Sequence, residues 1–522
     1  MLEKTQVETL DVQPVNAGAK AKAEPLYAAR ERIHPKRAEG SFRRLKWIIM
    51  LVTLGIYYIT PWLRWDRGPF APDQAVLIDM PGRRFYFFFI EIWPQEFFFV
   101  AGLLVMAGVG LFLITSVVGR AWCGYACPQT VWTDLFLVVE RFFEGDRNAR
   151  IKLDKQPWDA DKLSKKVPKH IVFLLISVAT GGAWIFYFAD APTLLREFFI
   201  GEAPMTAYFS VALLTATTYG FGAIMREQVC IYMCPWPRVQ GAMLDENSLV
   251  VTYNDWRGEP RTLGRKKAMA AGKNIGDCVD CNQCVAVCPV GIDIRDGQQF
   301  ECITCALCID ACDSVMDKLG LEKGLISYAT LADYNNNMRA ATDPATGSID
   351  PTQVRKPDGG FVDAIRGFSL REMLRLRTII YFAAWCGIGL ALVFALLSRD
   401  RLEVNVQQDR NPIYTIMSDG SMRNGYTVKI LNMIPEPRTI RLSINGLPGG
   451  RMQVNGIEQE HESFLVDVPV EPDKVRALRV FIHQPPELVM PGATPFTITA
   501  EDKQSFEIDV YNATFATPEI GP

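Results

Sequence analysis

Residues 278–289 read CVDCNQCVAVCP, and residues 302–312 read CITCALCIDAC. Each stretch has the spacing C-x2-C-x2-C-x3-C, which is typical of bacterial ferredoxins that hold two [4Fe–4S] clusters. In this pattern three closely spaced thiolates hold one cluster, and the fourth cysteine of the run binds the other cluster. The spacing therefore predicts one cluster on Cys278, Cys281, Cys284 and Cys312, and a second on Cys302, Cys305, Cys308 and Cys288. Zinc also accepts four thiolates, but its sites do not usually repeat this spacing twice.

Five uncharged apolar runs surround these motifs. They are Trp47–Leu63, Phe97–Gly119, Ile171–Ala189, Ala203–Met225 and Thr378–Ser398. About 20 apolar residues in a helix cross the hydrocarbon core of a bilayer. The alternative is a set of buried helices in a large soluble protein, but five runs of this length with charges at both borders argue against it. The sequence therefore predicts an α-helical bundle of five transmembrane spans.

Basic residues predict the orientation of the spans. Nine Lys or Arg residues lie between Lys20 and Lys46, and the loop over 120–169 is also basic, so the N-terminus is expected in the cytoplasm. The predicted organisation is a disordered basic cytoplasmic tail (1–46), spans one to four (47–235), a cytoplasmic segment (236–377) with an α+β ferredoxin domain at about 268–320, span five (378–398) and a periplasmic domain (399–522). Twelve of the 13 cysteines then lie on the side where thiols stay reduced, which favours metal ligands over disulfides.

Four further cysteines form a duplicated pattern. CGYACP (123–128) and CIYMCP (230–235) both read C-x-Y-x-C-P, and each follows an apolar run. The i, i+4 spacing predicts that both thiols of a motif lie on one face of a helix, which the proline bends or ends. Two such pairs offer four soft sulfur donors at the membrane surface, and soft sulfur ligands select Cu(I). The alternative is that these cysteines are only packed at helix ends, but the duplication favours a metal or redox role for Cys123, Cys127, Cys230 and Cys234.

The last domain alternates apolar and polar residues. Six short strands are predicted at 426–433, 439–445, 463–470, 475–483, 496–500 and 504–511. Several short strands at regular spacing are typical of an immunoglobulin-like β-sandwich. A sandwich of this kind more often holds a partner than performs chemistry.

Other classes of function lack support. The formal net charge of −3 gives no indication of nucleic-acid binding, which needs a basic face. Four ungrouped histidines argue against a bis-histidine haem in the membrane, and no dinucleotide, phosphate-loop or nucleophile-elbow motif is present. The amphipathic segment Val131–Phe143 is expected to lie in the membrane interface.

The mean hydropathy of +0.07 is an average over very apolar spans and ordinary soluble domains.

Taken together, these features resemble the CcoG/FixG/RdxA family, whose members are accessory proteins for cbb3-type cytochrome c oxidase. The resemblance covers about residues 40–520. It rests on the two ferredoxin runs and on CGYACPQ (123–129), CIYMCPWPR (230–238), VTYNDWRGEPR (251–261) and CDSVMDKLGLEKGLI (312–326). One departure is Asp313, which stands where the second run would carry a proline; ligation does not depend on it.

The resemblance implies a bacterial inner-membrane protein that reduces Cu(II) to Cu(I) for copper delivery to the oxidase. It implies the C-x3-C-P cysteines as the copper or redox site, and oxidase-assembly and copper-transport factors as partners. An unidentified cytosolic protein or cofactor would donate the electrons. Two other hypotheses stay open: a quinol dehydrogenase subunit that feeds a periplasmic reductase, and a non-redox assembly scaffold.

Overall fold

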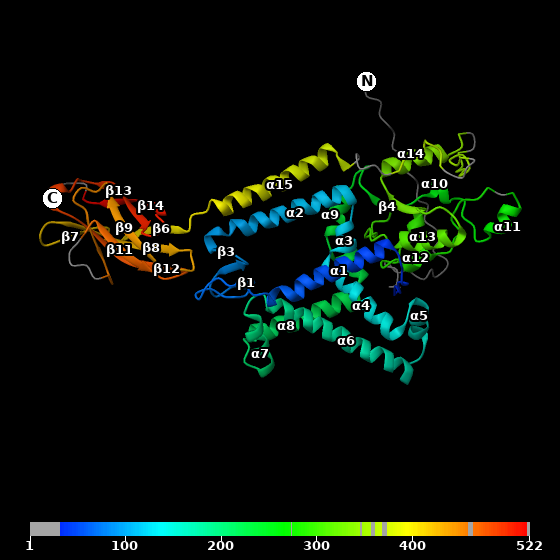
Figure 1. Ribbon diagram of the computed structural model, residues 1–522, viewed down its shortest axis with the longest axis horizontal. Helices are drawn as coiled ribbons and strands as arrows, with labels where there is room; N and C mark the ends of the chain where they lie inside the picture. The colour runs from blue at the N-terminus through cyan, green and yellow to red at the C-terminus, as the bar shows by residue number, and fades with distance from the viewer. Residues whose placement is uncertain are drawn as a thin grey trace, which may run out of the picture.

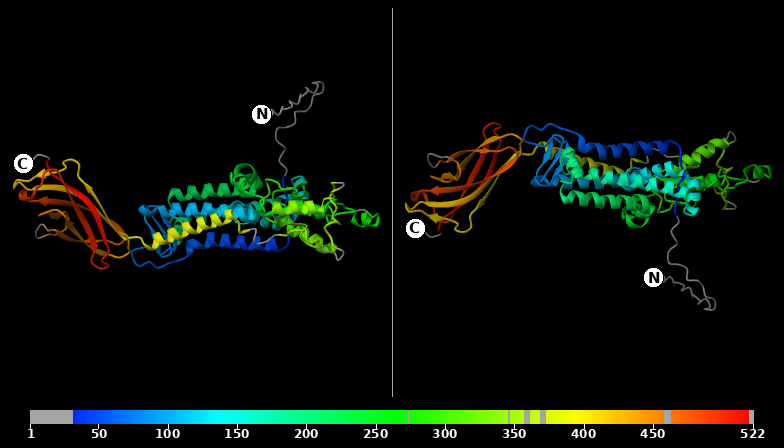
Figure 2. Two further views of the ribbon diagram at one scale, coloured as in Figure 1. Left: turned by 90° about the horizontal axis from the view of Figure 1, so that it is seen from above. Right: turned by 90° about the horizontal axis from the view of Figure 1, so that it is seen from below.

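The computed structural model describes residues 32–272, 274–344, 347–356, 361–367, 373–457 and 463–518. These residues form a long molecule with three parts in a row (Figures 1 and 2). A β-sandwich lies at one end, long helices lie in the middle, and a cysteine-rich domain lies at the other end. Residues 1–31, which include most of the tail expected to be disordered, lie outside the described residues.

Five helices in the described part of the chain are long and apolar enough to cross a membrane. They are α1 (Ser41–Ile59), α2 (Phe98–Val118), α6 (Ala160–Ile185), α8 (Met205–Thr218, continued by a π-helix over Tyr219–Met225) and α15 (Leu376–Leu397). Large apolar side chains on these helices point outward; Leu104 of α2 and Phe394 of α15 are 69% and 73% exposed. Exposed apolar surface of this extent is typical of contact with lipid, so the prediction of a five-helix membrane protein is confirmed in helix number, length and composition.

Two spans begin more than one helical turn before their apolar runs. The first helix begins at Ser41, and α6 begins at Ala160 rather than at Ile171. The expectation of disorder over 1–46 is therefore wrong for residues 32–46, in which His34 and Ala38 are also buried. The polar composition of this segment was misleading because its partners come from distant parts of the chain.

The spans pack in pairs. Helix α2 lies along α15, and α6 lies along α8 (Figure 1). Gly181 permits the second pairing, since a Cβ atom there would lie 2.9 Å from the Val211 carbonyl oxygen on α8. Shorter helices connect the spans: α3 (Ala121–Tyr125), α4 (Pro128–Glu144), α5 (Arg147–Lys155), α7 (Ala191–Ile200) and α9 (Trp236–Met243).

Helix α4 contains the segment that was expected to lie in the membrane interface. Its acidic residues are buried rather than solvated: Asp134 pairs with Arg43 at 2.8 Å, and Glu140 pairs with Arg150 at 2.8 Å and Arg226 at 2.6 Å. The helix packs against α6 and forms part of the interior of the protein. The amphipathic pattern alone did not show that the charged face of α4 meets opposite charges, because these partners lie elsewhere in the chain.

The cysteine-rich domain is built from short elements. Strands β4 (Val250–Tyr253) and β5 (Ile326–Ala329) pair in antiparallel register, and α12 (Gln283–Val287) and α13 (Leu307–Leu319) each begin within a cysteine run. The remaining helices are α10 (Asp255–Gly258), α11 (Arg265–Ala270) and α14 (Leu331–Ala341). This mixture agrees with the α+β prediction.

One carboxylate attaches this domain to the first span. Asp310 of α13 accepts hydrogen bonds from the backbone N–H groups of Phe42 (3.2 Å) and Arg43 (2.7 Å). A helix N-terminus carries free N–H groups and the positive end of the helix dipole, so a carboxylate there is favourable. Gly40 makes room for it, since a Cβ atom at that position would overlap the Asp310 side chain.

The terminal domain is a two-sheet sandwich. One sheet has the order β10-β12-β8-β6 with β7 beside β8, and the other has the order β11-β9-β13-β14. The strands are β6 (Leu402–Gln408), β7 (Thr415–Ile416), β8 (Met422–Asn432), β9 (Arg438–Asn445), β10 (Arg451–Val454), β11 (Leu465–Val470), β12 (Lys474–Gln484), β13 (Ala493–Asp502) and β14 (Ile508–Ala516). Val428, Ile440 and Ile498 are fully buried between the sheets. The six predicted strands are present with shifted ends, and β6, β7 and β10 were not predicted.

A small antiparallel sheet lies beside the sandwich. It consists of β1 (Val76–Asp79), β2 (Arg84–Phe87) and β3 (Ile90–Ile92). Arg84 donates a hydrogen bond to the Asp473 carbonyl of the sandwich and lies 3.3 Å from the Glu91 carboxylate. The sandwich is therefore held against the first inter-span loop.

Candidate metal centres

The two cysteine runs fold into the same local structure. Asp280 and Asn282 in the first run have positive φ, and so do Thr304 and Ala306, the residues 24 positions later in the second. Left-handed residues are uncommon outside glycine, and here they alternate with the cysteines. Such conformations turn backbone N–H groups toward a concave site, which favours anionic groups such as iron–sulfur clusters.

The structure gathers the eight cysteines around two cavities. One cavity is lined by Cys278, Cys281, Cys284 and Cys312. The other is lined by Cys288, Cys302, Cys305 and Cys308, and Cys284 also contributes to its lining. The fourth cysteine of each run thus lies with the first three of the other run. Apolar side chains complete both walls, including those of Met316 and Ile294.

The electrostatics of these cavities suit a cationic metal core. Burial raises the pKa of Cys284 to about 11 and that of Cys312 to about 12; in the other set it raises the pKa of Cys302 to about 11 and that of Cys288 to about 12. Neighbouring thiolates raise the pKa further in all four cases, and at Cys284 the charge of Arg295 is the largest opposing contribution. A raised pKa means that the buried thiolate is costly to form. Coordination to a metal ion offsets that cost and deprotonates the thiol outright. The donor set, its burial and the N–H groups around it all fit [4Fe–4S] clusters.

The C-x3-C-P motifs occupy the ends of spans that face the cysteine-rich domain. Cys123 lies in α3, just after α2, and Cys127 precedes α4, which begins at Pro128. Cys230 lies in a π-helical turn over Val229–Met233, and Cys234 follows that turn in extended conformation. The prediction that both thiols of a motif share one helix face is therefore wrong, because the chain turns between them and a proline starts or caps the next helix.

The four thiols of the two motifs nevertheless form one group. Burial raises the pKa of Cys230 to about 12, and the charges of Cys127, Cys123 and Cys234 raise it further. Burial likewise raises the pKa of Cys123 to about 11, against the opposing charge of Arg120. The Cys123 thiol donates a hydrogen bond to Gln240 Oε1 over 2.9 Å. No three His, Cys, Asp or Glu side chains in the described ranges are arranged around a single metal ion, so the four thiols are neighbours without forming a closed mononuclear site.

The first motif touches the loop of the second cysteine run. Cys123, Ile303 and Cys305 belong to one buried apolar cluster, and the Tyr125 hydroxyl donates a hydrogen bond to the Cys305 carbonyl over 3.2 Å. Gly124 makes this approach possible. A Cβ atom there would lie 2.6 Å from the Ile303 carbonyl oxygen, so any side chain would push the two segments apart.

Arg120 lies between the two kinds of site. It is 5% exposed, its guanidinium donates to the Phe300 carbonyl, and its charge opposes the upward pKa shifts of Cys123 and Cys302. Sequence reasoning missed Arg120, Gly124 and Gln240. The only local signal was the position of Gly124 inside the motif, because the partners of all three come from other parts of the chain.

Family models match most of the chain. A 4Fe-4S dicluster domain matches residues 225–331, a 4Fe-4S binding domain matches 98–144, and the Ig-like fold at the C-terminus of FixG matches 392–518. The first of these matches includes both ferredoxin runs and the second C-x3-C-P motif, and the second match includes the first motif.

Curated relatives match nearly end to end. Nitrogen fixation protein FixG of Rhizobium meliloti (strain 1021) is 64% identical over 515 residues, which cover 99% of this chain and 98% of that protein. Proteins RdxB and RdxA of Cereibacter sphaeroides are 54% and 51% identical, and these matches cover 88% and 89% of this chain and 90% and 91% of the relatives. The predicted family resemblance is confirmed.

Proposed function

The chain belongs to the FixG/RdxA family of iron–sulfur proteins, and from this premise we propose that it is a membrane-bound cupric reductase that assists assembly of a cbb3-type cytochrome c oxidase. The family and its 4Fe-4S domains support an electron-transfer role. The finer proposal is that one electron reduces each Cu(II) ion to Cu(I) at Cys123, Cys127, Cys230 and Cys234. The eight ferredoxin cysteines would hold two clusters, which supply single-electron transfer when bound.

The observation that carries this proposal is the contact between the first C-x3-C-P motif and the cysteine run. Electron transfer weakens steeply with distance, so donor and acceptor must be close. Gly124 lies against Ile303, and Tyr125 is bonded to Cys305. If the motif served only to pack helix ends, it would not need to lie this close to the loop of the second cysteine run.

The thiol group also has the chemistry to receive copper. Thiolates are soft ligands and favour Cu(I) over harder ions, so they stabilise the reduced product. Arg120 offsets part of the negative charge that develops when Cys123 loses its proton. A cavity of about 30 Å³ beside Cys230, walled by Gln129, Arg226 and Glu227 among others, has room for a water molecule or a single ion.

The proposed topology places the cysteine-rich domain in the cytoplasm and the sandwich in the periplasm of a bacterial inner membrane. The two domains lie at opposite ends of the spans (Figure 2). The basic segments before α1 and around α5 lie at the end of the cysteine-rich domain, as the positive-inside rule requires of a cytoplasmic face. In this arrangement the sandwich is free to bind oxidase-assembly or copper-transport factors.

The test uses purified full-length protein in nanodiscs with its clusters reduced by dithionite and the excess reductant removed. Cu(II) is added, and Cu(I) is followed with a specific chelator while EPR follows cluster oxidation. Replacement of Cys123, Cys127, Cys230 and Cys234 by serine is expected to abolish Cu(I) formation while EPR still counts two clusters. Cys386→Ser, the remaining cysteine on α15, is the matched control.

Undiminished Cu(I) formation by the four-serine variant overturns the assignment of the site. Rapid reduction of the clusters by a quinol, with no Cu(II) reduction by the unmodified protein, favours a quinol dehydrogenase subunit instead. Oxidase assembly that survives loss of both clusters favours a scaffold.

A further inference from the structure

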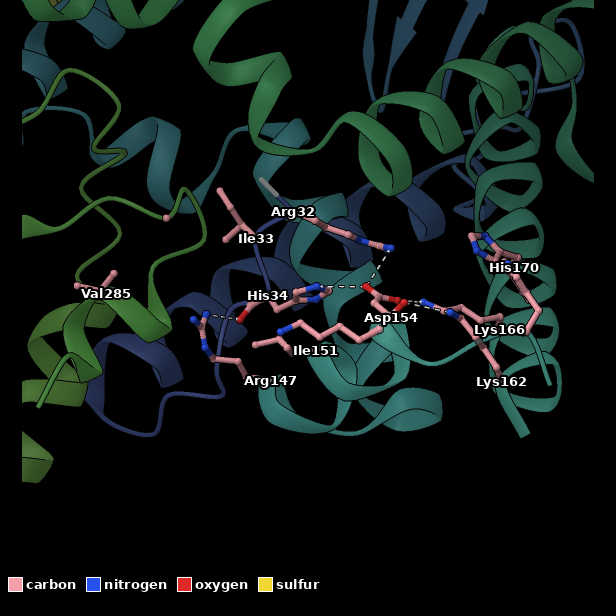
Figure 3. A pocket seen from close by; sticks show the side chains of 13 residues that line it. Arg32, Ile33, His34, Arg147, Ile151, Asp154, Lys162, Lys166, His170 and Val285 are labelled. Atoms are coloured by element: carbon pink, nitrogen blue, oxygen red, sulfur yellow. Dashed lines mark hydrogen bonds and ion pairs between the residues drawn. The ribbon is translucent and has the colours of Figure 1, made fainter. Parts of the chain in front are cut away.

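A basic cavity of about 1010 Å³ that none of the cysteines lines lies between α5, α6 and the segment that precedes α1 (Figure 3). Its charged lining consists of Arg32, Arg147, Lys155, Lys162 and Lys166, with Asp154 as the acidic member. Five cations around one carboxylate leave a large excess of positive charge. The site goes beyond the proposed copper chemistry and does not depend on it.

The acidic groups near the cavity are already shared among several cations. Asp154 lies 3.2 Å from Arg32, 3.2 Å from His34 Nε2 and 2.6 Å from Lys166. Behind the wall, Glu144 contacts both Lys166 and Lys169, and Glu140 contacts Arg32, Arg150, Lys169 and Arg226. These carboxylates cannot neutralise the whole lining.

Two of the cations have carbonyl oxygens as partners. The Lys162 ammonium donates to the carbonyls of Asp154 (3.1 Å) and Gln156 (2.7 Å), and Arg147 donates to the carbonyl of His34 (2.9 Å). A carbonyl orients a cation without cancelling its charge. These groups are therefore held in place and remain available to an anion.

The surface of α6 shows what kind of anion fits. Lys162, Lys166 and His170 recur every four residues and face the cavity (Figure 3). The adjacent stripe of Leu163, Val167, Ile171 and Leu174 is apolar, with exposed fractions of 53%, 46%, 53% and 50%. The basic stripe thus runs beside an apolar stripe that continues the lipid-facing surface of the span. A ligand that contacts both the basic and the apolar stripe needs a negatively charged headgroup and hydrocarbon chains.

We propose that this cavity binds the phosphate of an anionic phospholipid, whose acyl chains lie along the apolar stripe of α6. Basic pockets at the cytoplasmic end of membrane helices bind such headgroups. Trp158, which is 74% exposed and lies 5.0 Å from the Lys162 ammonium, is a residue type enriched at this depth of the bilayer. Val285 and Gly291 of the cysteine-rich domain also line the cavity, so the bound lipid joins that domain to the membrane.

The test is native mass spectrometry of lipid-depleted full-length protein, titrated with phosphatidylglycerol or phosphatidylcholine of equal chain length. Phosphatidylglycerol is expected to bind about tenfold more tightly. Loss of two headgroup cations in the double variant R147Q/K162Q is expected to weaken its binding by about tenfold or more. Lys165→Gln is the matched control, because Lys165 lies on the same helix and pairs with Asp161 in solvent.

Cluster absorbance and thermal stability verify that the variants are folded. If the double variant does not fold, Lys155→Gln replaces it, since Lys155 is an exposed lining residue. Equal affinity for the two lipids, or unchanged phosphatidylglycerol binding by the variants, overturns the proposal. Inorganic pyrophosphate distinguishes the source of the phosphate: displacement of the lipid by an equal concentration of pyrophosphate overturns lipid binding, and retention of the lipid supports it.

Discussion

The Tyr125 hydroxyl donates a hydrogen bond to the Cys305 carbonyl over 3.2 Å, and it joins residues 180 positions apart in the chain. Tyr125 lies between the two cysteines of the first C-x3-C-P motif, and Cys305 is the second of the four cysteines in the second ferredoxin run. The Tyr328 hydroxyl donates to the neighbouring Thr304 carbonyl over 3.0 Å. The membrane motif and the cysteine run therefore form one buried unit.

Gly124→Val is expected to slow oxidation of the reduced clusters by Cu(II) by about tenfold to a hundredfold. The new side chain must displace the Ile303 carbonyl, and a displacement of about 1 Å has effects of this size on reacting centres. Stopped-flow absorbance of the clusters measures the rate. Gly108→Val is the control, because nothing lies within 4 Å of a Cβ atom at that position on α2. Equal rates in both variants would show that the contact does not carry the electron.

Serine substitutions are expected to show that the last cysteine of each run binds the cluster held by the first three cysteines of the other run. Cys288→Ser should remove the same EPR signal as Cys302→Ser, although Cys288 belongs to the first run, because these residues line one cavity. Cys312→Ser should remove the signal that depends on Cys278. If instead Cys288→Ser and Cys278→Ser affect the same signal, each run holds its own cluster and the assignment is wrong.

Arg120→Gln is expected to lower the reduction potential of the cluster on Cys302, Cys305, Cys308 and Cys288 by tens of millivolts. Reduction adds negative charge, and the buried guanidinium stabilises that charge; a tenfold change in the one-electron equilibrium corresponds to about 59 mV. An EPR-monitored redox titration measures the shift. The exposed residue Arg238 provides the control variant Arg238→Gln, which should leave both potentials unchanged.

Glu140→Gln is expected to reduce the free energy of unfolding by about 3–5 kcal/mol, since it leaves buried cations without their counter-ion. Arg226, Lys169 and Arg150 hold the pKa of Glu140 well below its usual range despite burial. A carboxylate with a lowered pKa stabilises the fold above its unfolded value of 4.5 and loses this effect as the pH falls further. Denaturation in mixed micelles measures the free energy of unfolding from pH 7 to pH 3. This free energy should fall more steeply with decreasing pH for the unmodified protein than for the variant.

The control for this experiment is Glu39→Gln, whose side chain is 80% exposed. It should leave both the stability and its pH dependence unchanged. A stability loss at Glu140 no larger than at Glu39 would contradict the role assigned to the buried network.

Glu91 is expected to make the stability of the protein depend on pH. Burial and the Asp473 carboxylate raise the pKa of Glu91 to about 7, against the opposing charges of Arg84 and Arg399. The folded state therefore binds the proton more tightly than the unfolded state, and stability falls as the pH rises from about 4.5 to about 7. Glu91→Gln should flatten this dependence, because it removes a loss of up to about 3 kcal/mol in the free energy of unfolding at pH 8. Thermal unfolding at pH 5 and pH 8 measures it, with the exposed Glu436→Gln as control.

The features that sequence reasoning predicted well are those encoded in consecutive residues. An apolar run of about 20 residues is sufficient to identify α2 or α15, since a helix of that length crosses the bilayer on its own. Alternation predicts strands such as β9 and β12 because successive side chains face opposite sides of a sheet. The two ferredoxin runs predict their own cluster loops, because three thiols within seven residues can reach one metal core.

The structure was needed wherever the partner of a residue is distant in the chain. The segment over 32–46 was predicted to be disordered and helix α4 to lie in the membrane interface, because no local partner for their charges was visible, yet Arg43 and Asp134 neutralise each other in the interior. The C-x3-C-P thiols were expected to be paired along a helix, but the chain turns within each motif, and the thiols of the two motifs come together from separate parts of the chain. Spacing of residues specifies local geometry, but burial and long-range contact depend on how the spans pack. Only that packing places Gly124 against Ile303, and with it the membrane thiols against the cluster loop.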